Sequence, residues 1–186
     1  MFNSHRVLNC WVFLSFLCAG NAAIAQAATP VAVVLSAKKV SPDHPLEPPF
    51  QLNTVAGRLA ITQSGDMPVF EFHITLNGND LFTDNDDQSL NTVLVQPVEH
   101  PSLLVLQLSS GGTACPARYR LLDLGTKPKP FLSDEIGNCS DLVKLVSQKN
   151  KLLLNFPKIG GAEAERWSYT LADPKHAGLL KKVSQR

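Results

Sequence analysis

Two pairs of residues in this sequence have the types and the spacing that chemistry requires. Glu71 and His73 lie two positions apart in a segment of alternating polarity, so both would point to one face of a strand and could form an acid–base pair. Arg118 and Arg120 have the same spacing and could bind a carboxylate or a phosphate through paired hydrogen bonds. For both pairs we favour the simpler interpretation, the solvated face of a strand, and we keep the two arginines as a candidate anion-binding site.

A cluster of acidic residues could bind calcium, and its spacing can be tested against a known loop. The cluster comprises Asp80, Asp84, Asp86 and Asp87. An EF-hand loop that began at Asp84 would need a glycine at its sixth position and a glutamate at its twelfth. Ser89 and Val95 stand there instead. We therefore interpret the cluster as a soluble turn and expect no metal site.

Other catalytic and metal-binding motifs are missing from the sequence. Residues 109–113, SSGGT, lack the G-x-S-x-G pattern of a serine nucleophile, so a flexible turn is expected there. No two histidines have the spacing of metal ligands; beyond residue 25 they stand at His44, His73, His100 and His176. We expect no cofactor.

The N-terminal residues have the pattern of a secretory signal peptide. Arg6 precedes an apolar stretch at residues 7–19, which ends in small residues around Ala23 and Ala25. A transmembrane anchor would need about 20 apolar residues, and a lipoprotein acylated at Cys18 would need a small residue where Leu17 stands. We predict that residues 1–25 are a cleaved signal and that 26–186 form a single exported domain.

Composition limits the classes of function. The chain has 17 Lys and Arg against 16 Asp and Glu, and 18% of its residues are charged. These values argue against a disordered chain and against a general nucleic-acid binder, which needs a clear basic excess. No apolar run after the signal approaches the length of a membrane span, so we expect a product without a transmembrane segment.

Two cysteines remain after the predicted cleavage, Cys115 and Cys139. An even number of cysteines in an oxidising compartment predicts a disulfide, here closing a loop of about 25 residues. A catalytic thiol at Cys115 is the alternative, but it would require an unpaired cysteine beside a histidine.

The rest of the sequence predicts strands. Residues 69–76 alternate apolar and polar side chains, as a half-buried antiparallel strand does. Apolar runs at 92–98, 103–108 and 119–124, and segments with one apolar side at 151–156 and 166–171, are separated by turn residues, with hairpins expected at 64–66 and 77–80. Residues 142–146 fit a helix or a strand, and we favour a strand. The prediction is an all-β, mainly antiparallel sandwich or barrel-like meander, with a short C-terminal helix within residues 173–186.

The residues around the two cysteines form a distinct pattern. It reads G-G-x-A-C-P-A-x-Y-R at residues 111–120 and G-x-C-S-D at 137–141. This pattern resembles that of small exported proteins of Gram-negative bacteria for which no activity is known. The resemblance implies export and the pairing of Cys115 with Cys139, and it implies no catalytic residue.

These observations predict a non-catalytic β-domain, periplasmic or secreted, that binds another macromolecule. The expected partner is a protein of the cell envelope, for which this chain would be an inhibitor or an immunity protein. A small envelope hydrolase that uses carboxylate and histidine chemistry, with Glu71 and His73 in its site, is the alternative. A structural component of the envelope is a third interpretation.

Overall fold

The structure, a computed structural model, describes residues 40–67, 69–171 and 177–184. These residues belong to one compact unit, Ala32–Arg186. The predicted signal peptide at residues 1–25 lies outside the described residues. No helix that could span a membrane occurs in the part of the chain that the structure describes.

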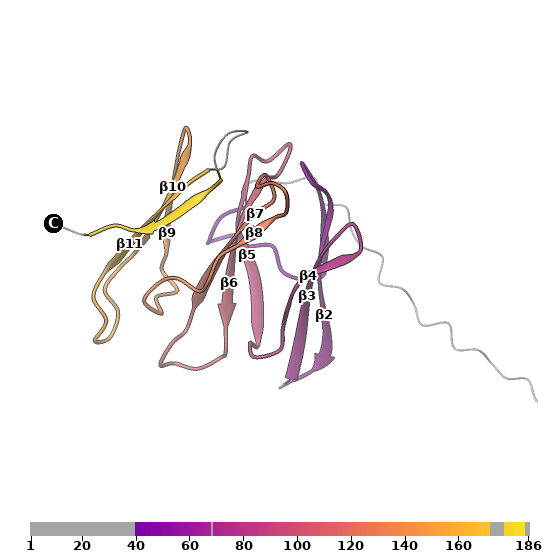
Figure 1. Cartoon of the computed structure of the whole chain (residues 1–186). Coiled ribbons are helices and arrows are strands. Elements are labelled where there is room, and N and C mark those ends of the chain that lie inside the picture. Colours follow the sequence, from indigo (N-terminus) through magenta and orange to yellow (C-terminus); the bar gives the residue numbers. More distant parts are fainter. Residues whose placement is uncertain (1–39, 68, 172–176, 185–186) are drawn as a thin grey trace, which may run out of the picture. The chain divides into compact units, whose positions relative to one another are not determined.

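The strands form three antiparallel sheets, each of which takes four consecutive strands in a simple meander (Figure 1). The N-terminal sheet comprises β1 (Phe50–Thr54), β2 (Gly57–Asp66), β3 (Val69–Leu76) and β4 (Asn79–Asp84). The middle sheet comprises β5 (Ser89–Gln96), β6 (Leu103–Ser109), β7 (Arg118–Asp123) and β8 (Phe131–Leu132). The C-terminal sheet comprises β9 (Lys144–Gln148), β10 (Lys151–Phe156), β11 (Glu165–Thr170) and β12 (Leu179–Lys182).

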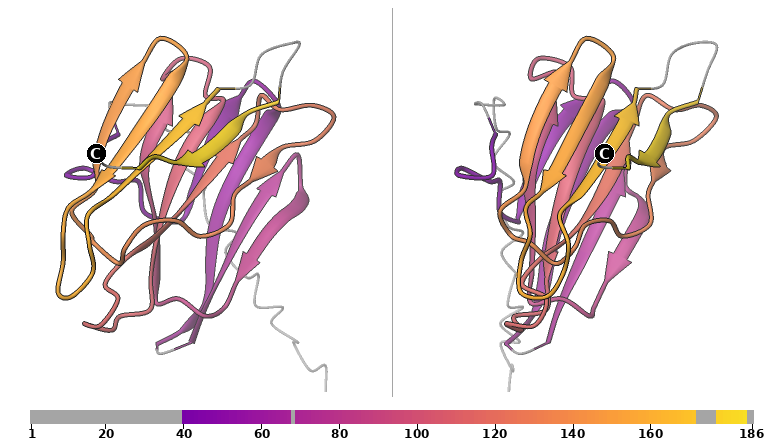
Figure 2. Two further views of the ribbon diagram at one scale, coloured as in Figure 1. Left: turned by 60° about the vertical axis from the view of Figure 1, so that its left-hand side comes forward. Right: turned by 90° about the vertical axis from the view of Figure 1, so that its left-hand side faces the viewer.

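The sheets are stacked in three layers, with the middle sheet between the other two (Figures 1 and 2). The first hydrophobic cluster joins the N-terminal and middle sheets and contains Leu59, Phe72 and Leu104. The second joins the middle and C-terminal sheets and contains Leu103 and Leu154. The middle sheet is thus buried on both faces. This burial explains why β5 and β6 read as continuous apolar runs, whereas β3 alternates.

The predicted all-β antiparallel fold is confirmed, and it has three layers. The strand at 69–76 has the predicted bounds, and Phe72 and Ile74 on its apolar face are buried. Asn77 and Gly78 both have positive φ and connect β3 to β4 as a two-residue turn, as the sequence predicts. The hairpin predicted at 64–66 is misplaced, because the pairing of β2 with β3 continues to Asp66 opposite Val69.

Two segments of ambiguous or helical pattern are strands. Residues 144–148 form β9, in agreement with the favoured interpretation. The predicted C-terminal helix is wrong, because residues 179–182 form β12, which pairs with β11. Leu180 packs against the second hydrophobic cluster from this strand, and burial at a sheet edge decides the conformation of so short a segment. Residues 172–176 and 185–186 of the predicted helix lie outside the described part.

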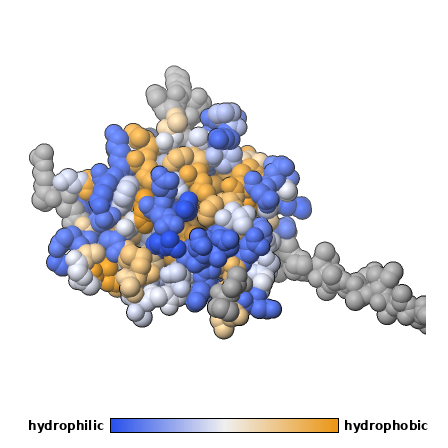
Figure 3. Space-filling model, turned by 60° about the horizontal axis from the view of Figure 1, so that its bottom comes forward, coloured by the Kyte–Doolittle hydropathy of each residue, from blue (hydrophilic) through white to orange (hydrophobic). Residues whose placement is uncertain are grey.

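Hydrophilic and apolar side chains are interspersed on the face seen in Figure 3. Most of the large apolar residues that are well exposed stand singly at turns or loops, such as Met67 and Leu142. Leu179 and Val183 are different, because they lie close together in sequence at β12, an edge strand. This part of the C-terminal sheet is therefore a candidate functional surface.

Candidate functional site

A groove runs between an edge of the middle sheet and an edge of the C-terminal sheet, and it has a volume of about 430 Å³. The edge strand on one side is β8, and the edge strand on the other side is β12. We call this feature the edge groove. Its lining residues are Phe131, Leu132, Ser133, Asp134, Glu135 and Ile136 on the first side, and Trp167, Gly178, Leu179 and Leu180 on the second.

The first side of the groove is a strand interrupted by a bulge. Ser133 and Ile136 both donate backbone hydrogen bonds to β7, at Leu121 and Tyr119 respectively. Two residues separate these bonded positions, and both, Asp134 and Glu135, are exposed. The bulge therefore places two carboxylates at the lip of an otherwise apolar wall.

The second side depends on close packing around Tyr169. The Tyr169 hydroxyl donates a 2.5 Å hydrogen bond to Asp123, and its ring stacks on Phe131 at 6.1 Å between centroids. Burial raises the pKa of the Tyr169 phenol, and Asp123 raises it further, so the phenol stays a neutral donor. A Cβ on Gly178 would lie 1.8 Å from the Tyr169 hydroxyl oxygen, so only glycine lets the chain enter β12 at this point.

Trp167 is fixed by polar contacts at the edge and the face of its indole ring. Its indole N–H donates a 2.9 Å hydrogen bond to Glu165, and the Lys182 ammonium lies 5.9 Å from its ring centroid. Burial raises the pKa of Glu165, but hydrogen bonds from Lys182 and Trp167 outweigh it and the pKa is lowered. Glu165 is therefore a carboxylate that holds a preformed aromatic surface in the groove.

Arg118 and Arg120 do share one face of β7, as predicted, but this face is only partly exposed, with the two side chains 31% and 22% exposed. Tyr119 and Leu121 point into the second hydrophobic cluster, and Arg120 lies over the Phe82 ring of the N-terminal sheet, 4.8 Å from its centroid. A middle sheet has no outer face, which is why this part of the interpretation is wrong.

Carboxylates of the protein already bind both arginines. Arg118 contacts Asp87 at 2.6 Å and Glu135 at 2.9 Å, and Arg120 contacts Glu135 at 3.3 Å. An external anion would have to displace these partners. The anion-binding role of the arginines stays a prediction, and the geometry gives them a structural task, since Glu135 ties β7 to the lip of the edge groove.

The acidic cluster separates into exposed and buried members. Asp84 and Asp87 are buried, whereas Asp80 and Asp86 are exposed. Burial and the neighbouring charge of Asp87 raise the pKa of Asp84 to about 6, although the Asp86 backbone N–H opposes this shift. Within the described residues no group of three or more potential ligands could hold a metal ion.

Replacement of Asp84 by asparagine is expected to stabilise the protein at neutral pH. The raised pKa means that the folded state binds a proton between about pH 4 and pH 6 that the unfolded state has lost, so stability falls as the pH rises through this window. Above it, Asp84→Asn should raise the free energy of unfolding by about 1–2 kcal/mol after allowance for solvent screening, and near pH 4 by almost nothing. Urea unfolding at both pH values measures this, with Asp86→Asn as the exposed control. A destabilised Asp84→Asn at neutral pH would show that the carboxylate is stabilised by a cation.

The structure brings Glu71 and His73 together on the outer face of the N-terminal sheet. Their side chains are 3.5 Å apart and are 48% and 32% exposed. Thr83 lies 3.4 Å from the other ring nitrogen of His73. This is the solvated strand face that the sequence favours, and neither residue lies near the edge groove.

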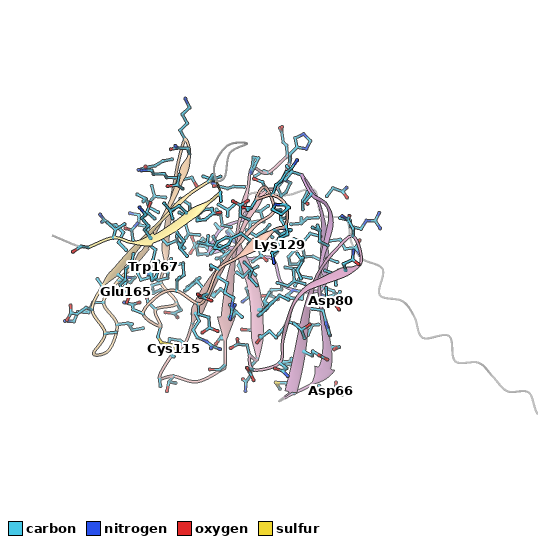
Figure 4. The ribbon with its side chains drawn as sticks, in the orientation of Figure 1. Asp66, Asp80, Cys115, Lys129, Glu165 and Trp167 are labelled. Atoms are coloured by element: carbon cyan, nitrogen blue, oxygen red, sulfur yellow. A yellow bond between two sulfur atoms is a disulfide. The ribbon has the colours of Figure 1, made fainter. Side chains whose placement is uncertain are left out.

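The predicted disulfide between Cys115 and Cys139 is confirmed (Figure 4). It joins the loop between β6 and β7 to the segment that follows the bulge at Asp134 and Glu135, with the two Cα atoms 4.5 Å apart. The bond is consistent with an oxidising compartment outside the cytoplasm.

No protein-family model, no curated protein and no solved structure matches this chain. The resemblance inferred from the cysteine pattern therefore stays a prediction. The edge groove is not predicted from the sequence, because its walls come from residues 131–136 and 178–180, which are far apart along the chain. The sequence feature that relates to the groove is the spacing of two between Trp167 and Tyr169, and this spacing predicts a buried strand face but not a groove.

Proposed function

We propose that this chain is an exported, non-catalytic β-domain that binds another protein, as an inhibitor or an immunity protein does, and that the edge groove is its binding site. The observation that carries the proposal is the position of this apolar groove between two edge strands, β8 and β12. Edge strands offer backbone donors and acceptors to an incoming extended segment, and an adjacent groove can accept its alternate side chains.

Two features of the groove support a protein as its occupant. Trp167 lies in it with its orientation already set by Glu165, and a preordered tryptophan is a common centre of binding energy at protein interfaces. The neighbouring Arg118 binds both Asp87 and Glu135, so we assign these three residues to stability and not to turnover.

Export is supported by two independent observations. The apolar segment at residues 7–19 has the pattern of a signal peptide. The Cys115–Cys139 disulfide requires an oxidising compartment to persist. A periplasmic or secreted protein meets both conditions.

The test is capture of partners from native envelope extract with the tagged protein, its disulfide intact. A specific partner should bind near one to one, and Trp167→Ala should weaken it by about 30-fold or more, the loss typical of a binding hot spot. Asp134→Lys, which alters only an exposed residue at the lip, should also weaken binding without changing thermal stability. Met67→Ala removes a side chain that is 79% exposed at the turn after β2 and should have no effect. Equal capture by all four proteins would contradict the proposal.

A further inference from the structure

The outer face of the C-terminal sheet carries a concentration of positive charge. Leu152, Leu154 and Tyr169 of this sheet are buried in the second hydrophobic cluster, so the residues that alternate with them point outward. The right-hand view of Figure 2 looks toward this side of the molecule. We call it the basic face, and its cations are Lys144, Lys151, Arg166 and Lys181, all of which are exposed.

The antiparallel register brings these outward residues into rows across the strands. One row is Gln148, Lys151, Thr170 and Leu179; the next is Val146, Leu153, Ser168 and Lys181; the third is Lys144, Asn155 and Arg166. These rows contain no carboxylate, and no ion pair of the four cations occurs among the described residues. Arg166 donates a 2.7 Å hydrogen bond to the neutral side chain of Asn155 in the same row.

This concentration is a property of one face and not of the whole chain. The formal net charge is +1, and loss of Arg6 with the predicted signal would bring it to zero. The outer face of the N-terminal sheet carries Glu71 together with His73. Four cations in rows that contain no carboxylate give this face a positive electrostatic potential, although the net charge of the chain is close to zero.

Apolar side chains accompany the cations. Leu179 and Val183 are 48% and 37% exposed at the edge of the face, and Leu153 is half-buried near its centre. The rows contain no aromatic residue on which a nucleobase could stack, which argues against single-stranded nucleic acid as the partner. Cations beside exposed aliphatic groups match the surface of a bilayer, where phosphate headgroups lie above acyl chains.

We infer that the basic face docks this protein on the surface of an anionic lipid bilayer. The cations contact lipid phosphates, and Leu179 and Val183 reach the boundary with the acyl chains. The inference goes beyond the proposed function, because none of the four cations lines the edge groove, although Leu179 belongs to both surfaces. It adds a second surface that would hold the protein near an envelope partner.

The experiment is co-sedimentation of the exported protein with phosphatidylcholine vesicles that contain about 30% phosphatidylglycerol. The double variant Lys151→Gln/Lys181→Gln should bind about 30-fold more weakly, since each cation near an anionic surface contributes about 1 kcal/mol. Lys127→Gln/Lys129→Gln, in the exposed loop between β7 and β8, removes the same charge and is the matched control. It should retain most of the binding.

Three outcomes would overturn the inference. The first is equal loss in both double variants, which would mean that only net charge matters. The second is equal binding to vesicles of pure phosphatidylcholine. The third is binding of duplex DNA, but not of vesicles, that depends on Lys151 and Lys181. Trp167→Ala should leave vesicle binding unchanged, so failure here and failure of the edge groove are distinguishable.

Discussion

Replacement of either of two neighbours on β6, Leu103 or Leu104, by alanine is expected to lower the free energy of unfolding by about 2–5 kcal/mol. Both side chains are 0% exposed. They lie in different hydrophobic clusters, because adjacent residues of a strand point to opposite faces and the middle sheet is covered on both. In a sandwich of two layers, either Leu103 or Leu104 would face water, and its replacement by alanine would change the free energy of unfolding little.

The matched control is a pair of neighbours on β3 in the N-terminal sheet. Ile74 is buried in the first cluster, whereas Thr75 points to the outer face. Ile74→Ala should destabilise the protein like the β6 variants, and Thr75→Ala should change its stability by less than about 1 kcal/mol. Denaturant unfolding of the four variants measures the difference. A small effect at either Leu103 or Leu104 would be incompatible with a middle layer.

Loss of the disulfide is expected to have an effect of similar size. Cys115 and Cys139 are 24 positions apart, so their bond closes a loop of about 25 residues, and the chain-entropy relation gives about 3.5 kcal/mol for such a loop. Cys115→Ala/Cys139→Ala should lower the free energy of unfolding by about this amount. The measurement is denaturant unfolding with and without a thiol reductant.

The reductant provides the internal control for this prediction. It should destabilise the natural protein to the level of the double variant and should leave the variant unchanged. If the natural protein keeps its stability in reductant while its thiols become reactive, the loop is held by its other contacts and the entropic account fails.

The sequence predicts the strands of this protein better than it predicts their stacking. Alternation in β3 and the turn at Asn77 and Gly78 are local signals, and both are confirmed. The apolar runs of β5 and β6 are explained by burial on both faces, but the sequence alone does not predict this burial, because nothing in the runs identifies the sheets that supply it. Which sheets cover the middle one depends on residues of all three sheets, and the apolar faces of these sheets have similar composition.

The edge groove could not be predicted for two physical reasons. β8 has two residues and follows a segment with two prolines, Pro128 and Pro130, so it has no alternation that could be detected. The C-terminal residues LLKK of β12 suit a basic helix equally well, and only the packing of Leu180 selects the strand. The same holds for Arg118 and Arg120. Their spacing of two predicts that they share one face of a strand, but it does not predict that the N-terminal sheet packs against this face.

Amide hydrogen exchange on the captured complex tests the central claim, that the edge groove binds a partner protein. Addition of an extended segment to β12 would give its amides new hydrogen bonds. We expect slower exchange at residues 131–136 and 179–182 in the complex than in the free protein, and unchanged exchange in β2 and β3. Unchanged exchange at both walls of the groove, with protection elsewhere, would contradict it.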